Sequence, residues 1–188
     1  LQCIGVKEGL KLVSGMYIVI IKRRIFFFAD TTVNVDPNPE QLAEIAITTA
    51  ETVKGFDIVP KIAMLAFSNF GSTPYEQSQK VAKATAIVKR LRPDLMVDGE
   101  MQADTAVVHE RLESEFPFST LKGGANVLIF PTLDAGNIAY KLFQRLTDAT
   151  VVGPILMGMK KPVHVIQRGD TVQDIINMSA IAVVEASK

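Results

Sequence analysis

Residues 125–148 read ANVLIFPTLDAGNIAYKLFQRLTD and contain three kinds of segment in direct succession. The first, residues 126–130, is a short and continuous apolar run, as expected for a strand that is buried on both faces. A polar turn follows it, and we expect Gly136 and Asn137 to open a helix. Strand, turn and helix in this order form the repeating unit of a parallel sheet with covered faces.

The same alternation extends outward along the chain. A predicted hairpin joins residues 17–21 to residues 25–28 through the basic turn at residues 22–24. A predicted helix follows, with Pro39 near its first turn and Gly55 at its end. Further predicted elements are a strand at 62–67, a helix that Pro93 stops, a strand ending before Asp98, a strand from Thr150, and a last helix at 171–185.

The sequence therefore predicts the α/β class, as a three-layer α/β/α domain with a mainly parallel sheet. The first long helix should bury one face at helical spacing. That face consists of Leu42, Ile45, Ala46, Thr49 and Val53. Ligands of such sheets bind beyond the carboxyl ends of the strands, close to helix N-termini. Polar clusters follow the predicted strands there, after Phe67, Val97 and Phe130.

The composition excludes several classes of function. The chain has 188 residues with 20 basic and 20 acidic side chains, which gives no general attraction to nucleic acid or to an anionic membrane. Cys3 is the only cysteine, so neither an internal disulfide nor a cysteine-rich metal site is predicted. No apolar run approaches the roughly 20 residues of a membrane span. No glycine-rich nucleotide fingerprint is present.

The turn after residue 130 has two interpretations. Free backbone N–H groups at Gly136 and Asn137 could hold a phosphate or carboxylate, with Lys141 one turn further on. Alternatively, Asp134 or Asn137 only caps the helix and Lys141 faces water. The spacing itself fits both.

A second cluster, VDGEMQAD, brings together Asp98, Glu100 and Asp104. Such carboxylates can bind a divalent metal or share a proton. They are also common in the first turn of a helix, where the helix dipole favours negative charge. Without a second group of ligands we predict no metal site here.

The segment QRGDTVQD places Gln167 and Arg168 shortly before Asp174. Thr171 and Asp174 form the T-x-x-D pattern of a capping box, in which the aspartate only stabilises its own helix. The local sequence favours this structural interpretation. A chemical role for Arg168 and Asp174 needs wider context.

That context is a family resemblance. The motifs FADTTVNVDP, DGEMQAD, ANVLIFPTLDAGNIAYK, VGPILMGMKKPV and RGDTVQDI make the chain similar to the C-terminal part of the phosphate acetyl/butyryltransferases. The resemblance implies an α/β/α fold akin to isopropylmalate dehydrogenases, and a reaction between acetyl phosphate and coenzyme A. It implies that Arg168 binds the acyl phosphate and that Asp174 takes the proton from the thiol. The implied ligand-binding residues are Gly136, Asn137, Tyr140, Lys141 and Arg168.

Gln167 departs from the pattern, because active transferases carry serine there to stabilise the developing oxyanion. A glutamine amide also donates a hydrogen bond, but from a different place. VSGMYIVI, FSNFGS, KPVHVIQRG and NMSAIAVVEA also resemble the phosphotransacetylase-like C-terminal domain of bacterial NADP-dependent malic enzymes. That resemblance implies a regulatory and oligomerisation domain that senses acetyl-CoA. An active phosphate acetyltransferase, or a structural dimerisation domain with a dead pocket, are the alternatives.

The resemblance also implies a division of the chain. We expect residues 1–164 to form the family's second subdomain, and residues 165–188 to be a loop and terminal helix that return to a largely missing first subdomain. The start at Leu1 then indicates a fragment of a longer protein. Oxidation of malate, with its NADP and divalent metal, would belong to an absent N-terminal region, so no cofactor is expected here besides coenzyme A or acetyl-CoA as a ligand. We expect a cytoplasmic homo-oligomer, at least a dimer.

Overall fold

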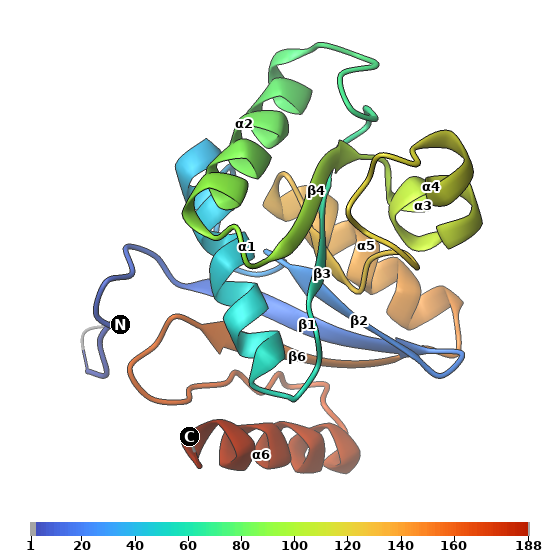
Figure 1. Cartoon of the computed structure of the whole chain (residues 1–188). Coiled ribbons are helices and arrows are strands. Elements are labelled where there is room, and N and C mark those ends of the chain that lie inside the picture. Colours follow the sequence, from blue (N-terminus) through green and yellow to red (C-terminus); the bar gives the residue numbers. More distant parts are fainter. Residues whose placement is uncertain (1–2, 188) are drawn as a thin grey trace.

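The computed structural model describes residues 3–187 and contains a six-stranded sheet (Figure 1). In spatial order the sheet runs β4-β3-β5-β2-β1-β6. β2, β5, β3 and β4 pair in parallel, and β1 is antiparallel to both of its neighbours. The predicted mainly parallel sheet is confirmed. The bounds are β1 Ser14–Ile21, β2 Arg24–Ala29, β3 Lys61–Leu65, β4 Met96–Met101, β5 Val127–Ile129 and β6 Thr150–Met157.

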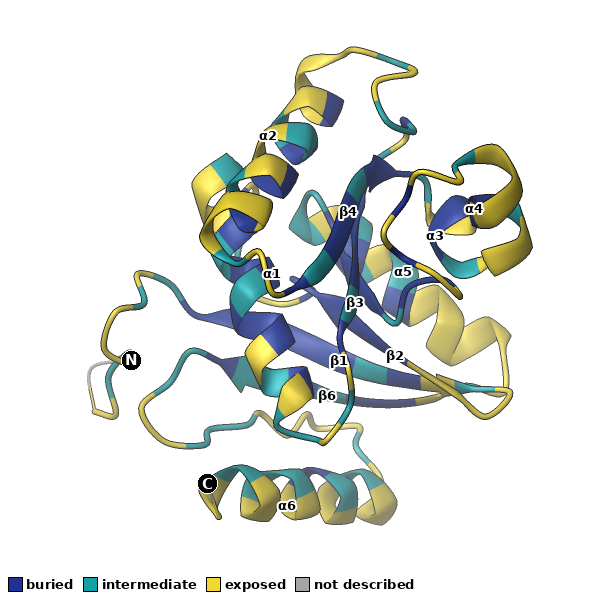
Figure 2. Cartoon of the chain, in the orientation of Figure 1, coloured by how far each residue is buried: buried dark blue, intermediate teal, exposed yellow. Residues whose placement is uncertain are grey.

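Helices cover both faces of this sheet, which confirms the three-layer α/β/α prediction. They are α1 Pro39–Lys54, α2 Glu76–Leu91, α3 Ala103–Val107, α4 His109–Glu115, α5 Leu133–Leu146 and α6 Val172–Ala186. Successive residues of a strand point to opposite faces. Accordingly, Met16 and Phe27 join the core under α1 and α2, while Tyr17 and Phe28 join the core on the other face. Figure 2 shows the buried sheet between helices whose outer sides are exposed.

The first hairpin and first helix lie close to their predicted positions. Ile21 pairs with Arg24, so the turn holds only Lys22 and Arg23, at φ values of 50° and 65°. A two-residue turn with positive φ at both positions matches the right-handed twist of the paired strands. The turn therefore needs no third residue, and Arg24 belongs to β2. In α1, Asn38 forms a capping box and Gly55 caps the C-terminus. The predicted apolar face of α1 is fully buried.

The acidic cluster lies elsewhere than predicted, because Asp98 and Glu100 are inside β4 rather than beyond its end. Both are buried, and each is satisfied by its own hydrogen bonds. Asp98 Oδ2 accepts from Ser119 Oγ at 2.9 Å, and Glu100 Oε1 accepts from Ser68 Oγ at 2.8 Å. A strand can bury a carboxylate when such donors replace water. Within residues 3–187, no group of three or more His, Cys, Asp or Glu side chains is placed to hold a metal ion.

Helix α5 begins at Leu133, three residues before the predicted opening at Gly136. Thr132 caps it by accepting from the Ala135 N–H, and the Gly136 N–H donates to Thr132 O at 3.2 Å. Gly136 instead fits against the chain after β2, where a Cβ atom would lie 2.4 Å from the Asp30 carbonyl oxygen. Asn137 Nδ2 donates to the Thr31 carbonyl at 3.3 Å. The Gly136 N–H, which was predicted to be free, is therefore not available.

Helix α6 packs against β6, on the same face as α1 (Figure 1). Its N-terminus has the predicted capping box of Thr171 and Asp174. Only Met178 is buried. Near its C-terminus, Glu185 Oε2 lies 2.9 Å from Nε2 of His164, whose side chain is 6% exposed, although the two groups are not aligned for a hydrogen bond. None of the helices in the described part of the chain combines the length and hydrophobicity needed to cross a bilayer.

Candidate functional site

A small polar cavity of about 230 Å³ lies where β1, α5, β6 and the start of α6 meet. Helix α5 contributes successive turns of one face, and the loop between β6 and α6 closes the opposite side. The lining side chains that the following paragraphs use are Tyr17, Tyr140, Lys141, Arg145, Gln167, Asp170, Thr171 and Asp174.

Two stacked tyrosines form the inner wall of the cavity. The rings of Tyr17 and Tyr140 lie 3.9 Å apart between centroids, at an interplanar angle of 19°. Their hydroxyl oxygens are 3.3 Å apart, and Gln167 Nε2 donates to the Tyr17 hydroxyl at 3.1 Å. Both tyrosines are buried, at 3% and 5% exposure. Burial, followed by the contact with Tyr140, raises the pKa of Tyr17 far above its ordinary value. The Tyr17 hydroxyl therefore keeps its proton at neutral pH.

The loop before α6 makes a tight turn at residues 167–170. The Gln167 N–H donates to Asp170 Oδ2 at 2.7 Å, and the Asp170 N–H donates to the Gln167 carbonyl at 3.1 Å. Arg168 lies at the tip of this turn and is exposed. Among the described residues it has no hydrogen-bond or ion-pair partner, and it does not line the cavity. Its guanidinium group is therefore free to reach a ligand from outside the cavity.

The cavity lining carries two cations and two carboxylates, and these do not form ion pairs with each other. Asp170 accepts from the Gln167 backbone, and Asp174 accepts from the backbone and hydroxyl of Thr171 at 2.8 and 2.7 Å. Lys141 Nζ lies 5.3 Å above the Tyr140 ring. Neither Lys141 nor Arg145 has an acidic partner within the part of the chain that the structure describes. Both cations are therefore without an ion-pair partner among the described residues and can contact an anion.

The electrostatic state of Asp174 follows from its capping role. The backbone N–H of Thr171, and then its hydroxyl, lower the pKa of the Asp174 carboxyl below its ordinary value. A hydrogen-bonded carboxylate holds its negative charge more firmly and binds a proton less readily. Asp174 is therefore a weaker base than a free aspartate.

Four of the seven residues that the family resemblance assigns to the site line this cavity, namely Tyr140, Lys141, Gln167 and Asp174. Gly136, Asn137 and Arg168 lie outside its lining. Sequence reasoning missed Arg145, although its place four residues after Lys141 puts both cations on one face of a helix. It also missed Tyr17, which nothing in the local pattern connects to residue 167.

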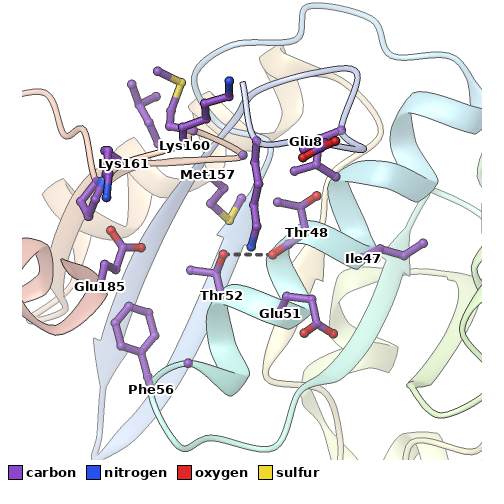
Figure 3. A pocket seen from close by; sticks show the side chains of 17 residues that line it. Glu8, Ile47, Thr48, Glu51, Thr52, Phe56, Met157, Lys160, Lys161 and Glu185 are labelled. Carbon is purple, nitrogen blue, oxygen red and sulfur yellow. Dashed lines mark hydrogen bonds between the residues drawn. The ribbon is translucent and has the colours of Figure 1, made fainter. Parts of the chain in front are cut away.

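A larger cavity of about 470 Å³ lies between α1, the end of β6 and the C-terminus of α6 (Figure 3). Thr48 and Thr52 of α1 form one wall, where the Thr52 hydroxyl donates to the Thr48 carbonyl at 3.0 Å. Lys161 and Glu185 belong to the opposite side. None of the site residues predicted from the sequence lines it, so the smaller cavity is the candidate site.

Comparison with known proteins agrees with the family resemblance of the sequence motifs. Residues 1–183 match the family model described as Phosphate acetyl/butaryl transferase. The chain is 45% identical to a phosphate acetyltransferase of Bacillus subtilis, over 99% of this chain and 58% of that protein. It is 44% identical to an NADP-dependent malic enzyme of Salmonella typhimurium, over 97% of this chain and 24% of that enzyme.

A solved structure matches equally well. The crystal structure of a phosphotransacetylase from Streptococcus pyogenes superimposes with a TM-score of 0.93 and 44% identity, covering 100% of this chain and 57% of that one. The chain thus spans a little under three fifths of these transferases and about a quarter of the malic enzyme. With the family model matched over nearly the whole chain, this protein belongs to the phosphate acetyl/butaryl transferase family and is a phosphate acetyltransferase-like domain.

Proposed function

We propose that this chain is an acetyl-CoA-sensing regulatory domain of an NADP-dependent malic enzyme, which binds the ligand's anionic groups at the Tyr140–Gln167 cavity. The observation that carries this proposal is the pair of unpaired cations, Lys141 and Arg145, beside a Gln167 that is hydrogen-bonded to Tyr17. A cavity of about 230 Å³ is below the roughly 300–1,000 Å³ of pockets for drug-sized ligands. It suits a phosphate or acetyl phosphate group rather than a whole coenzyme A.

Two features support binding over acetyl transfer. A general base works best when its pKa lies near the working pH, and the pKa of Asp174 is shifted the opposite way. The family's oxyanion-stabilising serine is replaced by Gln167, and one N–H of its amide is already used by Tyr17. Losing one oxyanion donor typically lowers the rate by about 10²–10³.

An active phosphate acetyltransferase is the second candidate, and the names of the relatives favour it. Phosphate acetyltransferases of Bacillus subtilis and Clostridium acetobutylicum match at 45% over 99% and 100% of this chain. The second N–H of the Gln167 amide remains free to stabilise an oxyanion. Under this candidate Arg168, at the tip of its turn, binds the acyl phosphate.

The deciding experiment uses the full-length protein and measures two rates. One is acetyl transfer from acetyl phosphate to coenzyme A, and the other is NADP-dependent malate oxidation titrated with acetyl-CoA. The regulatory proposal expects negligible transfer and a clear response of malate oxidation. Transfer at an ordinary enzymatic turnover, with no response of malate oxidation, would establish the second candidate instead.

Three variants locate the ligand within that experiment. Lys141→Ala, Arg145→Ala and Arg168→Ala each remove one charge, and a charge-assisted contact of about 1.5–3 kcal/mol corresponds to a loss of roughly ten- to a hundredfold in acetyl-CoA affinity. Lys83→Ala, which removes an exposed lysine of α2, is the matched control and should leave the midpoint unchanged. An unchanged midpoint in all three variants would exclude this cavity.

The subunit arrangement is part of the same proposal. Helix α5 buries only Gly136 and Tyr140, while Ile138, Leu142 and Leu146 are 51–76% exposed along one stripe. We propose that this stripe pairs with a second copy to form a symmetric dimer, since a C2 interface brings the same patch of both copies together. Leu142→Lys should convert the dimer to a monomer in light scattering. A wild-type monomer at high concentration would contradict the proposal.

The division of the chain is supported by α6. Its outer side exposes Val172, Ile176 and Val183 at 54–74%. A helix that is apolar on both sides is usually buried on both sides. We therefore propose that residues 165–188 return to the family's first subdomain, and that residues 1–164 form the second.

A further inference from the structure

We infer that Tyr17 is a positioning residue of the cavity, whose buried hydroxyl fixes the carboxamide of Gln167 toward the ligand. The identity of the ligand rests on the proposed function, whereas the contact between Tyr17 and Gln167 rests on the geometry alone. Tyr17 comes from β1, 150 residues before Gln167 in the sequence.

The Tyr17 ring is held from two sides. Across the sheet, Met16 pairs with Ile155 and Ile18 with Val152, so both Gly153 and Pro154 lie opposite Tyr17 alone. This is a β-bulge, a feature that often re-aims a side chain beside a functional site. Gly153 makes room for the ring, because a Cβ atom there would lie 2.6 Å from Tyr17 Cδ1. Tyr140 stacks on the ring at 3.9 Å.

The hydroxyl then connects the two walls of the cavity. Because burial keeps it protonated, it can accept from Gln167 Nε2 at 3.1 Å while it donates to the Tyr140 hydroxyl at 3.3 Å. The Gln167 backbone is fixed separately, through its N–H to Asp170. The side chain is therefore held at both ends, which leaves one amide N–H and the amide oxygen for a ligand.

This arrangement explains why glutamine and tyrosine occur together. A serine at position 167 is two carbons shorter and has no group that extends as far as Tyr17. A glutamine without its anchor would rotate freely, and ordering it would cost rotamer entropy on binding. With Tyr17 in place, that entropy is lost on folding instead, so the carboxamide meets the ligand already oriented.

The test uses Tyr17→Phe in the full-length protein, which removes the hydroxyl and keeps the ring. The first readout is the Gln167 side-chain amide signal in NMR, and we expect its hydrogen exchange to accelerate in the variant. The second is calorimetric affinity for acetyl-CoA, which should fall by roughly two- to tenfold, the usual effect of one neutral hydrogen bond. Tyr75→Phe, at an exposed tyrosine of the loop before α2, is the matched control and should change neither readout.

A double-mutant cycle separates positioning from general support of the fold. In a Gln167→Ala background, Tyr17→Phe should have no further effect on affinity, because Tyr17 acts through Gln167. The inference would be overturned if Tyr17→Phe lowered the affinity equally in the wild-type and Gln167→Ala backgrounds, or if it left the Gln167 amide signal unchanged. If the amide signal responds but the wild type binds no acetyl-CoA, the anchoring contact stands and the proposed function fails.

Discussion

Helices α1 and α6 have similar lengths and similar beginnings but different surroundings. They contain 16 and 15 residues, and each starts with a complete capping box. α1 buries eight residues against the sheet and α2, whereas α6 buries only Met178. Local signals thus start both helices, and packing stabilises only the first within this chain. The weakly packed helix is the one whose N-terminus carries Asp174 and borders the candidate site.

The largest expected difference between the two helices is in core packing. Leu42 of α1 is fully buried, so Leu42→Ala should lower the free energy of unfolding of the 188-residue chain by about 2–5 kcal/mol. Ile176 of α6 is 54% exposed, and Ile176→Ala should change the free energy of unfolding by less than about 0.5 kcal/mol. Urea denaturation of both variants measures this. Comparable losses would mean that α6 is packed as firmly as α1.

A smaller effect tests whether an exposed helix can still depend on one close contact. Alanine is normally favoured over glycine inside a helix by roughly 0.5–1 kcal/mol. Gly136→Ala in α5 should instead destabilise the chain by about 1–3 kcal/mol, because its Cβ would meet the Asp30 carbonyl oxygen. Gly169→Ala, which meets nothing within 4 Å, is the control for thermal unfolding. A stabilised Gly136→Ala chain would show that α5 can move away at little cost.

The two capping boxes should respond to the same change in different ways. Removing a cap costs about 1 kcal/mol. Asn38→Ala should lower the global free energy of unfolding by about this amount, since α1 is part of the core. Thr171→Ala should mainly accelerate amide hydrogen exchange in the first turn of α6, because a weakly packed helix opens locally. Equal global losses in the two variants would contradict this difference.

The smallest effect is a change in the titration of Asp174. Its folded-state pKa is lowered, so its contribution to stability is present above the unfolded value of about 3.9 and is lost as the pH falls through the lower folded value. Thr171→Ala removes the hydroxyl donor and should raise the pKa of Asp174 toward its ordinary value. NMR titration of the carboxyl signal measures the shift. An unchanged pKa would show that the Thr171 hydroxyl does not control this carboxylate.

Local patterns predicted those parts of the fold that depend on neighbouring residues. The hairpin, the bounds of α1 and its buried face, and the capping box of α6 all follow from turn chemistry, helical spacing or interactions over three to four residues. Helix α5 begins three residues before its predicted start, because Thr132 caps it and the local pattern offers several other candidate caps. Asp98 and Glu100 lie inside β4, contrary to the prediction, since no local signal shows that Ser119 and Ser68 approach to satisfy their charges.

The sequence by itself determined the alternation of strands and helices, the family, and the departure at Gln167. Only the tertiary structure decided that Tyr17 anchors that glutamine, that Lys141 and Arg145 remain unpaired, and that Arg168 stands outside the cavity. The physical reason is the range of each interaction. Caps and helical faces are set within a few residues, whereas the site forms where β1 lies between β2 and β6 and the Gly153 bulge admits the Tyr17 ring.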